Sequence, residues 1–225
     1  MTTVRSRNLA DPAGDHDSSW TGRSIIAYRC HMALTAKGRA TRQRIIEGAA
    51  QYLRGDDPGE VTLDDIRAIT GTSKSQIFHY FPAGKEELLL AVARHESQRV
   101  LDDQQPHLSR LTSWAAWNRW RDAVVARYRA QGRNCPLGAL MAQVGGTPGA
   151  AEVVTTLLAQ WQAHVGQGIT AMQAAGLVRP ELDPDRVSAA FIAGIQGGVQ
   201  VLRSTGSTWH LEATLDALID HLRGV

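Results

Sequence analysis

The chain has 225 residues, of which 43% are hydrophobic, and its formal net charge is +2 at pH 7. This length can bury a sizeable core, in one large domain or two unequal ones. The small net charge excludes a surface that attracts nucleic acid everywhere, and the two cysteines, Cys30 and Cys135, lack the spacing of a metal or redox site. No apolar run approaches the length of a membrane span, so we expect a reduced, cytoplasmic protein without membrane contact.

Residues 1–35 are expected to form a disordered leader or arm, because residues 1–29 mix polar and charged side chains without a sustained period. Two hypotheses stay open. Translation could start at Met32, or the leader could be a basic arm that follows the DNA backbone through Arg5, Arg7, Arg23 and Arg29. The intact mass of the protein from its native host distinguishes them, since a species that begins at Met1 contradicts the later start.

A basic cluster follows the leader. Four cations stand close together with no acidic residue between them, at Lys37, Arg39, Arg42 and Arg44. Such a cluster at the start of a helix suits phosphate contacts, although a solvated helix face is the plainer alternative. The pattern immediately downstream favours the first interpretation.

The next segment begins with a short helix that ends in a tight turn. Thr62 followed by Asp65 is a helix-opening pattern, because the hydroxyl can accept a hydrogen bond from a free backbone N–H. Gly71 provides the left-handed backbone that a sharp helix stop requires. The apolar residues of this helix fall at intervals of three, which predicts a narrow buried stripe made of Leu63, Ile66 and Ile69.

A second short helix begins at Ser73, whose spacing from Gln76 repeats the capping pattern. Its inward face is expected to hold Ile77 and Phe81, which leaves five residues on the outer and flanking faces: Lys74, Ser75, Gln76, His79 and Tyr80. A proline then prevents continuation, and Gly84 and Lys85 open a new helix. Two short helices joined through a glycine turn form the unit that places its second helix in the major groove of DNA.

These residues resemble the DNA-binding domain of the TetR family of bacterial transcriptional regulators. The resemblance covers residues 37–90 and rests on the basic first helix, the TL-x-x-I second helix, the S-K-x-x-I-F-H-Y-F recognition helix and the lysine that opens the fourth. Phe78 stands where many relatives carry tyrosine, so any hydrogen bond from that hydroxyl is absent here. A second resemblance, at residues 134–138 and 193–198, is to the C-terminal domain of the LmrA/YxaF-like branch, whose members are described as repressors of drug- and flavonoid-response genes.

The resemblance implies a set of contacts with double-stranded operator DNA. Phosphate contacts are expected from the first helix and from the starts of the second and fourth, at Lys37, Arg39, Arg42, Thr62 and Lys85. The recognition helix is expected to meet the major groove through Ser73, Lys74, Ser75, Gln76, His79 and Tyr80. Gln76 is the candidate for reading adenine, although its capping role could occupy its side chain.

The rest of the chain is expected to be helical, because no segment alternates with a period of two between turn signals. The expected helices span residues 86–105, 108–131, a short run after Pro136, 150–175, 184 to about 203, and 208–222. The fold class is therefore all-α, with about nine helices in total. A three-helix helix-turn-helix DNA-binding domain is expected at residues 36–84, and a larger C-terminal helical bundle for ligand binding and dimerisation at residues 85–225.

Aromatic residues of this bundle could line an apolar ligand pocket between helices. The candidates are Trp114, Trp117 and Trp161, with Asn118, Gln143 or Gln160 as polar contacts. Core packing is the alternative, since tryptophans at helical spacing are more often core residues. The family resemblance, rather than the spacing, implies that such a pocket exists.

Two C-terminal helices could form a dimer interface. Glycine inside a helix costs about 1 kcal/mol relative to alanine, so a helix that keeps several glycines needs a compensation such as close helix packing. The expected interface joins that helix to the leucine stripe of the last one, through Gly194, Gly197, Gly198, Val201, Leu211, Leu215 and Leu218. Packing within one chain is the alternative. A homodimer also suits a helix-turn-helix, since two recognition helices about one turn of DNA apart read a palindrome.

Catalytic function is not expected, and neither is a metal or another cofactor. The 8 histidines are scattered, and the chain has no H-E-x-x-H, no G-x-S-x-G and no phosphate-binding loop. We therefore interpret the sequence as a ligand-responsive transcriptional regulator, a repressor released from a palindromic operator by a small apolar or aromatic effector. The alternative is a constitutive helix-turn-helix DNA-binding protein, or an activator, with no small-molecule ligand.

Overall fold

The structure is a computed structural model that describes residues 34–54, 61–133 and 136–224. Almost all of these residues lie in one compact unit, Thr35–Val225. Both hypotheses about the leader concern residues outside the described part, and so do Asn134 and Cys135 of the second resemblance.

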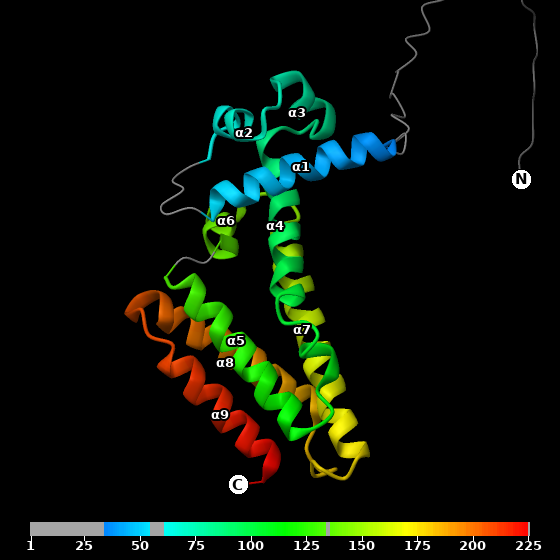
Figure 1. The fold of residues 1–225 in the computed structure, drawn as a ribbon, viewed down its shortest axis with the longest axis vertical. Coiled ribbons are helices and arrows are strands. Elements are labelled where there is room, and N and C mark those ends of the chain that lie inside the picture. The colour runs from blue at the N-terminus through cyan, green and yellow to red at the C-terminus, as the bar shows by residue number, and fades with distance from the viewer. Residues whose placement is uncertain (1–33, 55–60, 134–135, 225) are drawn as a thin grey trace, which may run out of the picture. The chain divides into compact units, whose positions relative to one another are not determined.

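Helices make up the regular structure of the described ranges, which contain no strand, so the all-α prediction is confirmed. In chain order they are α1 (Ala36–Leu53), α2 (Leu63–Thr70), α3 (Lys74–Tyr80), α4 (Lys85–Asp102), the short 3-10 helix η1 (Leu108–Arg110), α5 (Trp114–Gln131), α6 (Pro136–Val144), α7 (Ala150–Ala174), α8 (Pro184–Thr205) and α9 (Trp209–Arg223). Figure 1 shows α1, α2 and α3 grouped at one end of α4, and α9 beside both α5 and α8. None of the helices in these ranges is long and apolar enough to cross a membrane.

The two helices of the helix-turn-helix begin as predicted. The Thr62 hydroxyl accepts from the Asp65 N–H at 3.2 Å, while the Asp65 carboxylate accepts from the Thr62 N–H at 2.9 Å. Ser73 and Gln76 form the same reciprocal pair at the start of α3. Gly71 ends α2 in the left-handed conformation, with φ of 59°. Contacts between near neighbours in the sequence therefore define both ends of the turn.

The predicted stripe of α2 is wrong at Ile69. Ile66 is fully buried, but 42% of Ile69 is exposed, and Thr70 is buried instead. A helix turns by about 100° per residue, so the fourth residue after Ile66 stays closer to the buried face than the third. The Thr70 hydroxyl donates to the carbonyl oxygen of Ile66 at 2.7 Å, so its burial leaves no unpaired donor.

The predicted single helix over residues 108–131 is also wrong, because η1 and α5 are separate. Ser113 lies between them in an extended conformation (φ −158°, ψ 158°), and its hydroxyl accepts from the Ala116 N–H at 3.3 Å to begin α5. Leu108, the first residue of η1, and Leu111, which directly follows it, both enter the core. A Cβ atom at Gly168 of α7 would lie only 2.5 Å from Leu111 Cβ, so the break packs directly on α7. The apolar pattern continues across the break, which is why periodicity alone missed it.

Two clusters of buried apolar side chains form the core. The first joins α1, α2, α3 and α4 to α6 and the start of α7, and the second lies among α4, η1, α5, α7, α8 and α9. The helix α4 contributes to both, with residues 88–93 in the first cluster and residues 100 and 101 in the second. The first cluster therefore continues past residue 84, where the sequence analysis places the domain boundary.

Candidate functional site

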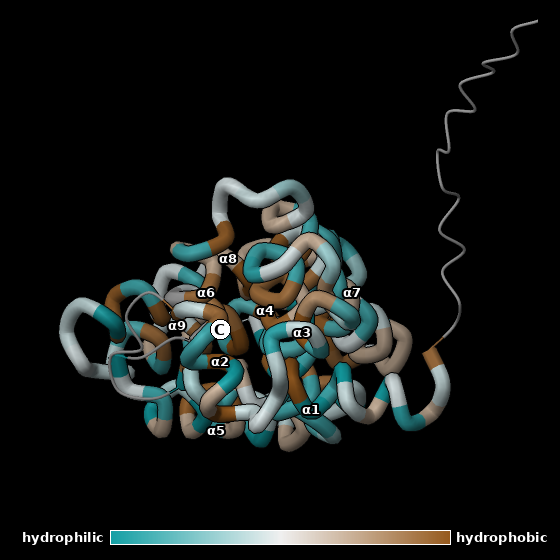
Figure 2. Tube along the Cα trace, turned by 90° about the horizontal axis from the view of Figure 1, so that it is seen from above, coloured by the Kyte–Doolittle hydropathy of each residue, from teal (hydrophilic) through white to brown (hydrophobic). Residues whose placement is uncertain are grey.

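The outer face of α3 holds the residues expected to read DNA bases. Ile77 and Phe81 are fully buried, so the predicted inward face is confirmed. The exposed side chains are those of Ser73, Lys74, Ser75, Gln76 and His79, with Tyr80 half-buried. Figure 2 looks down on α1, α2 and α3 and shows hydrophilic segments along all three. The geometry presents one short polar helix face, as a recognition helix requires.

Gln76 has a hydrogen-bonding conflict between its two expected roles. Its side-chain carbonyl Oε1 accepts from the Ser73 N–H at 3.0 Å, which completes the capping box. Bidentate recognition of adenine needs the same oxygen to accept from the base and the amide N–H to donate to it. While it caps α3, Gln76 can therefore offer a base its amide N–H₂ group and only the second lone pair of Oε1, in an orientation fixed by the cap.

Thr62 shows a similar conflict with its expected phosphate contact. Its hydroxyl donates to Asp65 Oδ2 at 2.6 Å, and its backbone N–H donates to the same oxygen at 2.9 Å. These two hydrogen bonds lower the pKa of the Asp65 carboxyl, the one from the hydroxyl more strongly. The capping box therefore contributes its stability above the ordinary pKa of an aspartate and loses it as the pH falls through the lowered value. A phosphate could use the Thr62 donors only by displacing Asp65.

The basic residues of α1 divide into two groups. Lys37 and Arg39 have exposed side chains. Arg42 instead places its guanidinium 4.8 Å from the centre of the Phe81 ring, and Arg44 donates to the carbonyl oxygen of Thr70. The second pair joins α1 to the helix-turn-helix, so part of the basic cluster positions the recognition helix.

Phe78 on α3 is an exposed aromatic side chain, which the apolar sequence pattern alone does not predict. Phe78 is 41% exposed although it is apolar. Its place directly after the buried Ile77 could have indicated this, because adjacent helical residues point in different directions. An exposed phenyl ring on a recognition helix can contact the methyl group of thymine. Gly84, with φ of 78°, leaves room for the ring, since a Cβ there would lie 3.3 Å from Phe78 Cε1.

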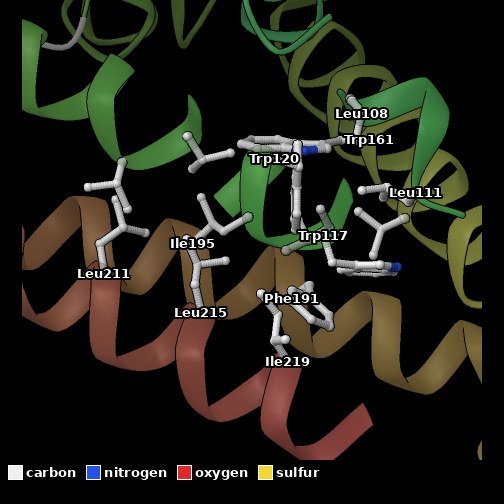
Figure 3. Close-up of a cluster of buried hydrophobic side chains, with 14 of the residues drawn as sticks. Leu108, Leu111, Trp117, Trp120, Trp161, Phe191, Ile195, Leu211, Leu215 and Ile219 are labelled. Atoms are coloured by element: carbon white, nitrogen blue, oxygen red, sulfur yellow. The ribbon is translucent and has the colours of Figure 1, made fainter. Parts of the chain in front are cut away.

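The candidate ligand residues of the C-terminal helical bundle do not share one pocket, and some of them are packed in the core. Trp117 is fully buried, and its ring centre lies 5.6 Å from that of Trp120 and 5.3 Å from that of Phe191. Figure 3 shows these rings together, with side chains of α9 pointing into the same cluster. Core packing, the alternative to a ligand contact, therefore accounts for the position of Trp117. Trp120 is held in place by its indole N–H, which donates to Gln104 Oε1 at 2.8 Å.

The polar ligand candidates make contacts elsewhere. Asn118 is exposed and its side-chain oxygen accepts from Arg223 at 3.1 Å, while the Arg223 guanidinium lies 5.2 Å from the centre of the Trp114 ring. Gln143 of α6 accepts from the backbone N–H of Val61 at 3.2 Å. Two candidates line cavities. Gln160 lines an open pocket of about 280 Å³ between α4 and α7, and Trp161 lines a smaller space of about 50 Å³ bordered by α4, α5, α6, α7 and α8.

Comparison with known families finds a match for the helix-turn-helix and another for the C-terminal helical bundle. Residues 45–92 match the family model described as bacterial regulatory proteins, tetR family, and residues 108–218 match the one described as tetracyclin repressor-like, C-terminal domain. The chain belongs to the TetR family of transcriptional regulators. The first match ends within α4 and the second begins at η1, so together they cover the helix-turn-helix and most of the helical body.

Relatives of this TetR-family chain include characterised regulators and solved structures. It is 26% identical over 166 residues to the transcriptional regulator AcuR of Cereibacter sphaeroides, which covers 70% of this chain and 74% of the relative. A TetR transcriptional regulator from Chloroflexus aurantiacus superposes with a TM-score of 0.67 at 24% identity, covering 83% of this chain and 96% of that one. A TetR-family regulator from Cytophaga hutchinsonii superposes with a TM-score of 0.70 at 20% identity, covering 85% and 97%. These structures show the shared fold.

The expected dimer residues of this TetR-family chain divide by burial. Leu211 and Leu215 are fully buried within the chain, and a Cβ atom at Gly198 would lie 2.7 Å from Leu211 Cα. A Cβ atom at Gly194 would lie 2.6 Å from Thr214 Cγ2, so this glycine also serves the packing of α8 on α9. The alternative of packing within one chain accounts for these four residues. Three others stay accessible: Gly197 is exposed, and Val201 and Leu218 are half-buried.

Proposed function

We propose that this TetR-family regulator is a homodimeric repressor that leaves a palindromic operator when a small effector binds in its helical body. The observation that supports the proposal is that α4 contributes buried side chains to both hydrophobic cores. A ligand that displaces one end of α4 changes the position of the other end, which packs against α1. A tenfold weaker operator affinity needs about 1.4 kcal/mol of difference between the two conformations.

Operator contacts are proposed for the DNA-binding head, which consists of α1, α2, α3 and the start of α4 and in which Lys37 and Arg39 are exposed and Lys85 is half-buried. Lys37, Arg39 and Lys85 are proposed to bind phosphates, and the exposed face of α3 is proposed to enter the major groove. Such contacts would place the regulator in the cytoplasm, where the DNA is. The domain boundary is proposed to lie within α4 rather than before it, because the first core includes residues 88–93.

The proposed dimer uses the outer faces of α8 and α9. Gly197, Val201 and Leu218 remain accessible there, and apart from the backbone of α8 itself and the two neighbouring residues, no described residue has an atom within 4 Å of a Cβ atom built at Gly197. A second copy could therefore approach the α8 backbone closely and form a four-helix interface. The narrower LmrA/YxaF-like assignment stays a prediction, which a shared effector with members of that branch would support.

The proposal is tested by fluorescence-anisotropy titration of the DNA upstream of the gene itself and of its divergent neighbour, against scrambled DNA, at two salt concentrations. Tight, sequence-dependent binding that saturates at two protomers, or a small multiple, per site supports the repressor. Equal, weak binding to both DNAs that salt abolishes contradicts a specific operator at this locus. Binding that no compound weakens, while reporter expression rises with the protein, favours the constitutive or activator alternative.

Lys85→Ala is expected to weaken binding to every DNA sequence and to lower the salt dependence of the affinity by about one unit on a log–log plot. The residue opens α4, which has no side-chain cap at its start, so a cation and the N–H groups of the first turn can bind one phosphate together. Titrations at several salt concentrations measure the slope. A changed sequence preference with an unchanged slope would show that Lys85 does not bind phosphate.

Gln76→Ala is expected to cost about 1–3 kcal/mol on the operator and to relax the preference at one base pair. The matched variant is Ser73→Ala, which removes the hydroxyl that accepts from the Gln76 N–H at 3.2 Å but leaves the Gln76 side chain intact. Binding to a library of single-base operator variants separates the two roles. If both variants lose affinity equally and neither changes the preference, Gln76 acts only as a cap.

A further inference from the structure

The cavity beside Trp161 has walls with unpaired polar atoms. Four of these atoms are buried and have no hydrogen-bond partner among the described residues: Nε and Nη1 of Arg127, Oε1 of Gln131 and Nε1 of Trp161. Arg127 and Gln131 lie one turn apart on α5, and Trp161 faces them from α7. Three of the four atoms are hydrogen-bond donors, so the cavity is short of acceptors.

Buried donors without partners are uncommon in folded proteins, because removing them from water is costly unless another group pairs with them. A single such atom carries little information: the indole nitrogen of Trp117 also lacks a partner, in the packed core. The convergence of several atoms on one small space is different. It indicates a group that enters the cavity and accepts hydrogen bonds.

The charges around the cavity favour an anion. Arg127 has a side chain only 11% exposed, and among the described residues its one ionic contact with a carboxylate joins Nη2 to Asp103 at 3.4 Å. Glu96 also borders the cavity, but its charge is already offset by two arginines: it pairs with Arg54 and, at 3.5 Å, with Arg99. The Nε and Nη1 side of the Arg127 guanidinium therefore has no acceptor among the described residues, while its positive charge is shared with Asp103 alone among the carboxylates of this part of the chain.

We propose that this cavity binds the carboxylate group of an anionic effector, which Arg127 holds through Nε and Nη1 while Trp161 donates its indole N–H. The Gln131 amide can turn over to present its N–H₂ group, since its two ends are alike in size. Apolar side chains complete the walls, at Val100, Leu157 and Val199, and exclude water that would weaken the ionic contact. The proposal rests on the effector function proposed above and specifies the chemistry of the ligand.

The volume limits what fits without rearrangement. A water molecule occupies about 30 Å³ in the liquid, so a cavity of about 50 Å³ admits a carboxylate with little attached to it. A larger acid must displace a wall, and the side chains least enclosed by the core are those of Gln196 of α8, which is exposed, and Leu137 of α6, which is half-buried.

The same cavity has a direct connection to the DNA-binding head. Glu96, on its wall, pairs with Arg54, the residue that ends α1. An anion bound by Arg127 brings a second negative charge close to Glu96. Arg54 and Arg99, which pair with Glu96, must then divide their ionic contacts between Glu96 and the anion. Arg54 is the member of this group that belongs to the head, so the anion acts on the position of α1.

The test follows the indole N–H signal of Trp161 by NMR in the full chain with ¹⁵N-labelled tryptophan, without DNA and at constant ionic strength. Trp161→Phe assigns the signal. The probes are sodium formate, acetate and propionate, and the uncharged controls are formamide, acetamide and propionamide. The expected result is a saturable shift with formate and acetate, and no saturable shift with the amides at the same concentrations.

Variants of α5 locate the charge that binds. Arg127→Met keeps the apolar stem and is expected to raise the dissociation constant for acetate by about tenfold or more. Arg127→Lys should retain part of the affinity. Arg119→Met, on the exposed side of the same helix, is the matched control and should leave the constant unchanged. Circular dichroism and operator binding confirm that each variant folds, and Trp161→Phe, followed by calorimetry, provides an independent test if Arg127→Met does not fold.

The outcomes separate this proposal from the repressor function. Equal responses to acetate and acetamide, no response to any of the acids, or equal constants for Arg127→Met and Arg119→Met would overturn the anion site. If uncharged compounds then released the operator, the effector function would stand without it. If acetate bound as expected but no acid, long or short, changed operator affinity, the anion site would stand and the proposed effector function would fail.

Discussion

Replacing Trp117 with alanine is expected to lower the free energy of unfolding by about 3–5 kcal/mol. The side chain is fully buried among the rings of Trp120 and Phe191, at centroid distances of 5.6 and 5.3 Å. Alanine leaves a space that these large side chains cannot close, so both the burial and the packing are lost. Urea unfolding followed by circular dichroism at a fixed protein concentration measures the change.

Trp209→Ala is the matched control, because that side chain is 68% exposed and its loss should change stability by no more than about 0.5 kcal/mol. Trp117→Phe keeps an aromatic ring in the cluster and serves if the alanine variant does not fold. Small and equal losses for Trp117→Ala and Trp209→Ala would contradict the core assignment and return Trp117 to the candidate ligand residues.

Alanine at Gly198 and at Gly197 is expected to change stability in opposite directions. A Cβ atom at Gly198 would lie 2.7 Å from Leu211 Cα, and because a backbone atom cannot move aside, α8 and α9 must separate. Overpacking of this kind costs about 1–3 kcal/mol. Apart from the backbone of α8 itself and the two neighbouring residues, no described residue has an atom within 4 Å of a Cβ atom at Gly197, so alanine there should gain the difference in helix propensity, about 1 kcal/mol.

Scanning calorimetry of both variants at two protein concentrations measures the pair of effects. A domain of this size changes its Tm by about 2–4 °C for each kcal/mol. Gel filtration provides a second readout, since Gly197→Ala should weaken the proposed dimer if a partner helix packs closely on that backbone. A Gly198→Ala variant as stable as Gly197→Ala would show that α8 and α9 are not packed this closely.

Local contacts explain which parts of the fold could be predicted from the sequence. The capping boxes at Thr62 and Ser73 and the left-handed turn at Gly71 depend on residues only a few positions apart, so their patterns are visible in the chain. Ile69 was assigned to the wrong face because two apolar spacings, three and four, fit a short helix almost equally well. The start of α5 was missed because Ser113 breaks the backbone without interrupting the apolar pattern.

The candidate site was predicted less completely, for a physical reason. The outward face of α3 follows from helical geometry once Ile77 and Phe81 face inward. The environment of the tryptophans depends instead on α7, α8 and α9, far away in the sequence. Arg127 and Gln131 could not be predicted as site residues, because nothing in their local sequence shows that they are buried or that Trp161 lies opposite. Such convergence exists only after the helices have packed.

The sharing of α4 and α7 between the two cores has a consequence for engineering chimeric regulators. A head excised after residue 92, where the N-terminal family match ends, would lose Ala93, Leu140, Val144, Ala150 and Val153, all buried in the first core. Five buried apolar side chains would be replaced by water, and the fragment would expose a surface prone to self-association. A transplantable DNA-binding module must therefore include α6 and the first turn of α7, and the intact chain should melt in one cooperative transition.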